Sequence, residues 1–159
     1  MNIIKAKHID AETISDIVSK SNKEIAVKFG LNNKNAPTHP SFYTKDWVMK
    51  DFEKGEEYFI FESNEIYMGC VAFEQPRADT AYLNRLAVLP EYQHNKIGEK
   101  LVKYILAYAK SKKVQKVSIG IIAEHILLKK WYLNLGFIEV STKSFDHLPF
   151  DVTYMKYEF

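Results

Sequence analysis

The sequence predicts a single α/β domain of the mixed (α+β) kind, with a mainly antiparallel seven-stranded sheet flanked by about four helices. First, 159 residues with a hydrophobic fraction of 47% are enough for one core, because a chain of this length buries roughly two-thirds of its unfolded surface. Second, the hydrophobic periodicity runs strand, two helices, three strands, helix, strand, helix and two strands. Third, no repeat, low-complexity tract or linker divides the chain, so residues 1–159 are expected to form one domain.

The composition argues against several functional classes. The formal net charge is only +2, whereas a nucleic-acid-binding domain should carry a basic patch or stripe. No stretch approaches about 18 consecutive apolar residues, and the N-terminal residues lack the apolar centre of a signal peptide. The single cysteine, Cys70, has no internal partner for a disulfide, which suits a reducing compartment. We therefore expect a cytoplasmic protein that binds neither membranes nor nucleic acid.

The first third of the chain predicts a strand, a helix, a loop and a second helix. The strand covers Ile3–Ala6, and Asp10 is a candidate N-cap for the helix that follows. Gly30 suits the position just after that helix. The segment Leu31–Tyr43 contains two prolines, which push their preceding residues toward extended backbone, so an ordered loop is expected. Thr44 is a candidate N-cap for the second helix.

The rest of the chain alternates strands with two helices. Three strands come next, at Tyr58–Phe61, Ile66–Phe73 and Ala81–Val88. Ser63-Asn64 predicts a hairpin between the first two, and the polar segment 75–79 connects the second to the third. A helix then opens near residue 95, where apolar side chains begin to recur at helical spacing. The remaining elements are a buried strand at Val114–Ile122, a helix at 123–135, and strands at Phe137–Thr142 and Val152–Tyr157, separated by the loop Phe145–Phe150.

The junction between the strand ending at Val88 and the following helix is a candidate anion site. Pro90 stops the strand, and a short polar loop leads directly into the helix. The start of a helix exposes unpaired N–H groups and the positive end of the helix dipole, which together suit a phosphate or pyrophosphate. From this stretch alone an ordinary strand–loop–helix junction is an equal alternative.

Two motifs at the expected separation resemble the GCN5-related N-acetyltransferase (GNAT) superfamily. The segment Leu86–Gly98 is similar to the family's Leu-x-Val-x-Pro-x-Tyr strand followed by its Gln/Arg-x-x-Gly-x-Gly/Ala loop. The later segment Tyr132–Phe137 is similar to its Tyr-x-x-x-Gly-Phe helix end. The order of elements fits over nearly the whole chain. The resemblance implies a sheet that splays between the strands Ala81–Val88 and Val114–Ile122, with the cofactor thioester entering between them.

The resemblance also implies which residues bind acetyl-CoA. Main-chain N–H groups of the loop would bind the pyrophosphate, and a bulged strand would pair with pantetheine and aim an N–H at the thioester oxygen. The sequence departs from the family pattern at His94 and Lys96, where glycine is usual. The expected cofactor-binding residues are Leu86, Ala87, Val88, Gln93, His94, Asn95, Lys96, Ile97, Gly98 and His125.

The resemblance also implies roles for two side chains of the later helix segment, Tyr132 and His125. Tyr132 corresponds to the tyrosine that hydrogen-bonds or protonates the departing CoA thiolate; packing as a half-buried aromatic is the alternative. His125 stands where the family often has an asparagine that contacts the cofactor. A histidine at a helix start could equally be a simple cap.

The acceptor amine must lose a proton, since an alkyl amine with a pKa near 10.4 is mostly protonated at neutral pH. The candidate bases are Glu74, Glu124, His39 and His147, or a water relayed by one of them, and spacing singles out none of these. We select Glu74, which ends its strand and could point toward the cleft, although a solvated strand end is the more common role for such a residue. The predicted acceptor pocket combines the early helices and their loop with the loop Phe145–Phe150. Its candidate residues are His39, Phe42, Tyr43, Trp47 and His147, although local packing would explain the aromatic residues equally well.

The predicted function is acetyl transfer from acetyl-CoA to a primary amine of a small molecule or protein, without a metal. A non-catalytic acyl-CoA-binding or regulatory module of the same fold is the alternative, which the departures at Lys96 and His125 keep open. Cys70 lies in an apolar segment and is expected to be a small buried side chain rather than a nucleophile. A homodimer is a further partner hypothesis, because splayed strands have unpaired edges.

Overall fold

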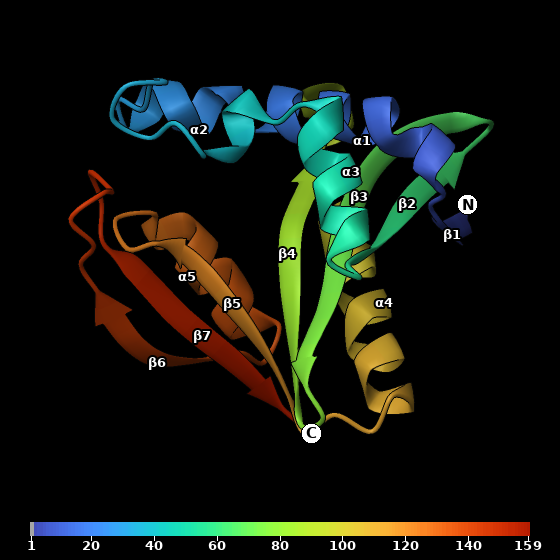
Figure 1. The fold of residues 1–159 in the computed structure, drawn as a ribbon. Coiled ribbons are helices and arrows are strands. Elements are labelled where there is room, and N and C mark those ends of the chain that lie inside the picture. Colours follow the sequence, from blue (N-terminus) through green and yellow to red (C-terminus); the bar gives the residue numbers. More distant parts are fainter. Residues whose placement is uncertain (1) are drawn as a thin grey trace.

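The computed structural model describes residues 2–159, and its elements follow the predicted order (Figure 1). The strands are β1 (Asn2–Lys5), β2 (Glu57–Ser63), β3 (Ile66–Arg77), β4 (Thr80–Val88), β5 (Lys116–Ile122), β6 (Ile138–Lys143) and β7 (Val152–Glu158). The α-helices are α1 (Ala11–Ser21), α2 (Lys23–Lys28), α3 (Lys45–Glu53), α4 (Ile97–Ser111) and α5 (Ile126–Asn134). Short 3-10 helices are η1 (His8–Asp10), η2 (Pro40–Phe42) and η3 (Pro90–Tyr92).

The seven strands form one sheet in the order β1-β2-β3-β4-β5-β7-β6. All neighbours are antiparallel except β4 and β5. This parallel pair is short, joining Thr80–Tyr82 to Lys116–Ser118, and beyond it the two strands diverge (Figure 1). The predicted fold class and the splay between these strands are therefore confirmed.

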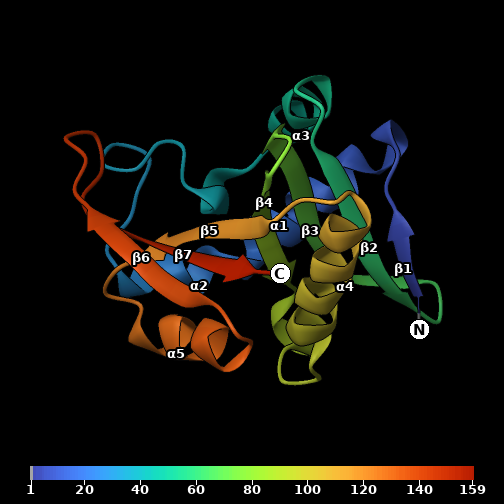
Figure 2. The ribbon, with the colours of Figure 1, turned by 90° about the horizontal axis from the view of Figure 1, so that it is seen from below.

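Helices cover both faces of the first half of the sheet. Figure 2 shows α4 on one face of β2–β4 and α1 behind the same strands. Leu101 and Ile105 of α4 are fully buried in the larger hydrophobic cluster, which continues through β5 to Tyr132 of α5. On the opposite face, Ile14 of α1 and Val48 of α3 pack in a second cluster against β2 and β3. The second half of the sheet, formed by β5, β7 and β6, has α5 on one side (Figure 1).

Two predicted helix boundaries are confirmed at the level of hydrogen bonds. The Thr44 hydroxyl accepts the N–H of Trp47 at 3.3 Å and so caps α3. Gly30 follows α2 with φ +64°, and the N–H of Leu31 returns to the Ala26 carbonyl at 2.7 Å, a helix ending that suits glycine. Asp10 also lies at the N-cap position of α1, but its carboxylate accepts the N–H of Lys7 at 2.8 Å instead of a helix N–H.

The structure differs from the prediction at three junctions. The expected first helix is divided into α1 and α2 at Asn22, whose side-chain amide donates to the Val18 carbonyl at 2.7 Å and so competes with the helix ladder. The segment 75–77, expected as a loop, extends β3, and a register irregularity next to Glu74 accommodates the proline there. The hairpin turn is Asn64-Glu65, both with positive φ, as in a type I′ turn.

None of the helices within residues 2–159 is long and apolar enough to cross a membrane.

Candidate active site

A cleft of about 1300 Å³ lies where β4 and β5 diverge. One wall is formed by residues 82–88 of β4 and by the start of α4. The other wall is formed by β5, β7 and α5. Of the predicted cofactor-binding residues, all except Asn95 line this cleft, and so does Tyr132. The fold therefore brings two motifs that are distant in the sequence to the same cavity.

The start of α4 is strained and has no side-chain cap. His94 has φ +68°, and Lys96, the N-cap residue, has φ +59° and ψ +20°. These left-handed conformations favour glycine, which explains why the resembling family has glycine at both positions. Among the side chains of residues 2–159, none caps the first turn of α4, so its N–H groups are available to an anion. Lys96 and Gly98 both line the cleft at this point.

The side chains of the α4 loop are otherwise used locally. Gln93 donates to the Val88 carbonyl at 3.4 Å, and Asn95 donates to the Tyr92 carbonyl at 3.2 Å. A Cβ added at Gly98 would lie 3.5 Å from the Trp131 indole, which is an ordinary contact. Gly98 therefore packs beside Trp131 without a strict steric need for glycine.

A β-bulge interrupts β4 beside the cleft. Cys70 pairs with Ala87 and Ala72 pairs with Asn84, so two residues of β4 stand opposite one residue of β3. The first of the two, Arg85, has φ +49°. The bulged residues Arg85 and Leu86 both line the cleft. The resemblance implies a bulge at this place, and the structure contains it.

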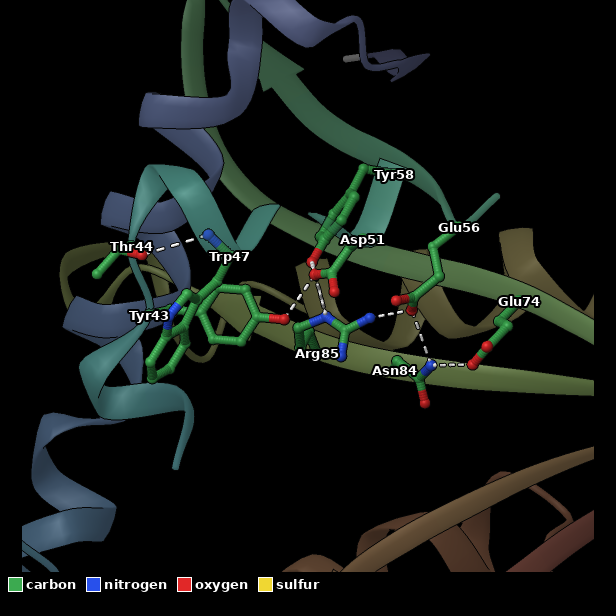
Figure 3. Close-up of polar contacts among 9 residues, drawn as sticks. All are labelled: Tyr43, Thr44, Trp47, Asp51, Glu56, Tyr58, Glu74, Asn84 and Arg85. Carbon is green, nitrogen blue, oxygen red and sulfur yellow. Dashed lines mark hydrogen bonds and ion pairs between the residues drawn. The ribbon is translucent and has the colours of Figure 1, made fainter. Parts of the chain in front are cut away.

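A buried polar cluster lies beneath the bulge (Figure 3). The Arg85 guanidinium forms an ion pair with Asp51 (Nε–Oδ2 3.3 Å) and a second, closer one with Glu56. Arg85 Nε also donates to the Tyr58 hydroxyl at 2.6 Å. The hydroxyls of Tyr58 and Tyr43 in turn donate to Asp51 Oδ2 at 2.6 and 2.5 Å. Sequence reasoning did not identify this cluster, because its members come from α3, β2, β4 and the segments just before α3 and β2.

Burial dominates the titration of this cluster. It raises the pKa of Glu56 to about 7, while Arg85 and the hydrogen bond from Asn84 pull it down. Burial also raises the pKa values of Tyr58 and Tyr43, so both phenols stay protonated at neutral pH. The cluster can therefore hold the charge of Arg85 without supplying a phenolate.

Glu74 lies beside the cleft but does not line it. It pairs with Tyr82 across β3 and β4, so the two side chains share a face of the sheet, and Tyr82 lines the cleft. The side-chain amide of Asn84, another lining residue, donates to Glu74 at 3.2 Å and to Glu56 at 3.0 Å (Figure 3). One amide thus links two carboxylates at the edge of the cleft.

Tyr132 is 5% exposed, and its ring packs against Trp131 and Phe137 with centroid distances of 4.9 and 5.2 Å. Within residues 2–159, its hydroxyl forms no hydrogen bond. Burial raises the pKa of Tyr132, so the phenol is protonated at neutral pH. Tyr132, which lines the cleft, therefore has a hydroxyl donor without a partner in the described part of the chain.

His125 both caps α5 and lines the cleft. Its Nδ1 accepts the N–H of Leu128 at 3.4 Å, so the capping alternative holds and the other ring nitrogen remains available. Burial, helped by the nearby Lys28 charge, lowers its pKa. The imidazole is therefore neutral at pH 7.

Among the predicted acceptor residues, only His39 lines the cleft. It is 9% exposed, and its Nδ1 accepts the Ser41 N–H at 3.2 Å. Because burial lowers its pKa and Nδ1 acts as an acceptor, neutral His39 carries its proton on Nε2. His39 is therefore better suited to donating a hydrogen bond than to acting as a base.

The other predicted acceptor residues lie outside the cleft lining. Trp47 is half-buried against Tyr43 at a centroid distance of 5.2 Å, and Phe42 is half-buried in η2. His147 is exposed beside Phe145. Their acceptor role stays a prediction. Lining residues that sequence reasoning missed include Tyr82, Asn84, Ser118, Tyr154 and Lys156.

Two further groups bear on the chemistry. Cys70 is fully buried, and burial raises its pKa to about 12, so it is a thiol rather than a nucleophile. Within residues 2–159, no group of three or more His, Cys, Asp or Glu side chains is placed to hold a metal ion.

A family model described as the acetyltransferase (GNAT) family matches residues 21–137. Similar solved structures include the PaiA N-acetyltransferase from Thermoplasma acidophilum in complex with coenzyme A, at 18% identity and a TM-score of 0.84, covering 99% of this chain and 98% of that one. The ribosomal-protein-S18-alanine N-acetyltransferase from Escherichia coli is 16% identical with a TM-score of 0.78, covering 99% and 92%. YncA from Salmonella typhimurium, with acetyl-CoA, is 18% identical with a TM-score of 0.70, covering 99% and 93%. No curated protein matches the chain.

Proposed function

This chain belongs to the GNAT acetyltransferase family, and from that premise we propose that it transfers an acetyl group from acetyl-CoA to a primary amine of a small molecule or protein. The transfer takes place by direct attack in a ternary complex. The observation that carries this proposal is that the uncapped start of α4 and the unpartnered Tyr132 side chain line the same cleft. The start of α4 would bind the diphosphate of coenzyme A, and Tyr132 would donate a proton or hydrogen bond to its sulfur.

The residues at the start of α4 fit the diphosphate of coenzyme A, which is a substrate in this reaction. Free N–H groups at a helix start bind phosphates through both hydrogen bonds and the helix dipole. The solved relatives that contain coenzyme A or acetyl-CoA support this choice of ligand. Gln93–Gly98 would hold the diphosphate, and His125 would contact the cofactor from α5. Asn95, although outside the cleft lining, would contribute through its main chain.

The bulged segment of β4 fits the acyl end. Leu86, Ala87 and Val88 line the cleft, and we assign them to main-chain hydrogen bonds with pantetheine and the thioester oxygen. A donor aimed at the charge that develops on that oxygen contributes about 3 kcal/mol of transition-state stabilisation.

Tyr132 would act on the departing sulfur. A free thiol has a pKa of about 8.5 and a free tyrosine about 10, so complete proton transfer from tyrosine to thiolate is uphill. Burial raises the pKa of Tyr132 and widens this gap. We therefore assign Tyr132 to donating a hydrogen bond to the thiolate.

Glu74 is our proposed base. It lies beside Asn84 at the cleft edge, where a water molecule could bring it the proton of the acceptor amine. The tautomer of His39 disfavours that residue as the base and suits it to binding the acceptor. The location we propose is a reducing cytosol, in keeping with the single buried thiol of Cys70. The homodimer hypothesis also stands as a proposal.

A second function, binding acyl-CoA without catalysis, is favoured by one observation. His94 and Lys96 hold left-handed conformations that glycine would adopt without strain, so the loop is not optimised for the tightest binding.

Thiol release from acetyl-CoA over a panel of amines separates the two functions, with Tyr132→Phe and the cleft-lining Tyr82→Phe compared with the wild type. A hydrogen bond to a charged group contributes about 1.5–3 kcal/mol, so we expect kcat of Tyr132→Phe to fall roughly 10- to 100-fold. The dissociation constant for acetyl-CoA should stay within about twofold, and Tyr82→Phe should retain most of its activity. Binding without turnover across the panel would establish the non-catalytic module instead.

A further inference from the structure

The conformation of Arg85 is unusual for an arginine in a strand. Its φ of +49° lies in the left-handed region, which costs free energy for every residue except glycine. In a bulge of this type the left-handed position is normally glycine. Something other than local preference therefore keeps Arg85 in this conformation.

The side chain of Arg85 supplies the missing stabilisation. Its guanidinium meets Asp51 from α3 and Glu56 from the segment just before β2, and its Nε also donates to Tyr58 (Figure 3). Asp51 and Glu56 are each 5% exposed. The ring of Tyr43 lies 5.5 Å from the guanidinium carbon and adds a cation–π contact. Three elements therefore hold one side chain from beneath the bulge.

A buried ionic cluster of this kind is poorly explained by stability alone. Removing two carboxylates and a guanidinium from water carries a large desolvation penalty, and apolar side chains of similar volume often stabilise a core equally well. The best-supported use of such groups is to select one conformation over others. Here the selected conformation is that of the main chain at Arg85 and Leu86, which lines the cleft.

We propose that Arg85 is a positioning residue, whose ion pairs with Asp51 and Glu56 hold the β4 bulge so that its main-chain N–H meets the thioester oxygen of acetyl-CoA. This inference rests on the proposed function. It adds that the geometry at the thioester is set by Asp51 of α3 and by Glu56 and Tyr58 at the start of the β2 segment, which do not themselves line the cleft. Within residues 2–159, no hydrogen bond or ion pair joins the cluster to the proposed diphosphate site at residues 93–98. The affinity for the cofactor and the polarisation of its carbonyl should therefore change independently.

The experiment compares wild type with Arg85→Gly, Arg85→Lys and Lys5→Met. Glycine tolerates the left-handed φ and removes the clamp, and it also leaves the carboxylates of Asp51 and Glu56 buried without their cation. Lysine retains a cation but not the planar fork that reaches both carboxylates. Lys5→Met is the matched control, because it removes an ion pair with Glu57 at 3.6 Å that lies on β1 and β2 away from the cleft. Each variant is saturated with acetyl-CoA labelled with carbon-13 at the carbonyl, and the carbonyl resonance is compared with that of free acetyl-CoA.

We expect the bound wild-type carbonyl to be shifted downfield, as for an oxygen that accepts a hydrogen bond. In Arg85→Gly the resonance should return most of the way to the free value, while the dissociation constant stays within about threefold. Arg85→Lys should recover part of the shift, and Lys5→Met should match wild type. With an amine that is turned over, kcat of Arg85→Gly should fall at least about tenfold.

Three results would overturn the proposal. One is a wild-type carbonyl at the free position, and another is an Arg85→Gly carbonyl that stays at the wild-type position. The third is a loss of acetyl-CoA binding in Arg85→Gly that parallels a loss of folded protein, because Arg85 would then only support the fold. Failure of the proposed function is distinct, since wild type would then bind acetyl-CoA without turnover while the carbonyl experiment still reports on Arg85.

Discussion

Replacing Lys96 by glycine and, separately, by alanine tests the geometry of the loop that leads into α4. Both changes remove the same ammonium group, and they differ only in the Cβ. Lys96 has φ +59°, where an L-residue pays about 1–2 kcal/mol. Glycine avoids that cost, but it loses more backbone entropy on folding than alanine does, which lowers the unfolding free energy by about 0.5–1 kcal/mol. The glycine variant should therefore be more stable than the alanine variant by about 0.5–1 kcal/mol.

Ala107, an exposed residue inside α4, provides the matched control. There the backbone is right-handed, so Ala107→Gly should lose about 1 kcal/mol. The preference between alanine and glycine thus changes sign between positions 96 and 107. Chemical denaturation with a common m-value measures both differences. An alanine variant at position 96 that is as stable as the glycine variant would refute the left-handed loop, and with it the arrangement of N–H groups at the start of α4.

Three further predictions follow from single positions. Replacing His39 by Asn keeps an acceptor for the Ser41 N–H but removes a group whose pKa is lowered by burial. Because neutral His39 is favoured in the folded protein, the unfolding free energy of the wild type should fall as the pH drops from 6.5, and that of the variant should fall less. Gly136→Ala should lower the unfolding free energy by about 2–4 kcal/mol, because φ is +100° and the new Cβ would lie 2.9 Å from the Tyr157 ring. Gly30→Ala meets no such contact and should lose only the backbone strain of about 1–2 kcal/mol. Thr44→Ala should lose about 1 kcal/mol and Thr44→Ser much less; equal losses in thermal or denaturant unfolding would contradict the cap.

Local patterns predicted the parts of the fold that local physics decides. The cap at Thr44, the helix ending at Gly30 and the uncapped start of α4 each depend on a few neighbouring residues. The splay between β4 and β5 came from resemblance rather than from pattern, because alternation of apolar residues does not reveal where paired strands part. The division between α1 and α2 was missed because one side-chain hydrogen bond of Asn22 decides it.

The site was predicted unevenly for the same reason. The segments 86–88 and 93–98 and Tyr132 were predicted from the resemblance in motif spacing, and the fold brings all of them except Asn95 to one cleft. Phe42, Trp47 and His147 were chosen for their residue type, which does not say where a side chain points. The Arg85 cluster depends on partners that are distant in the sequence, such as Glu56, which is 29 residues away. Neither residue type nor spacing indicates that such distant groups meet.

Calorimetric titration with acetyl-CoA and with acetyl-pantetheine, which lacks the diphosphate, tests the central claim most directly. If the free N–H groups at the start of α4 bind the diphosphate, acetyl-CoA should bind with measurable heat and the truncated thioester should bind at least about 100-fold more weakly. Equal affinity for the two ligands, or no heat with acetyl-CoA, would contradict the account.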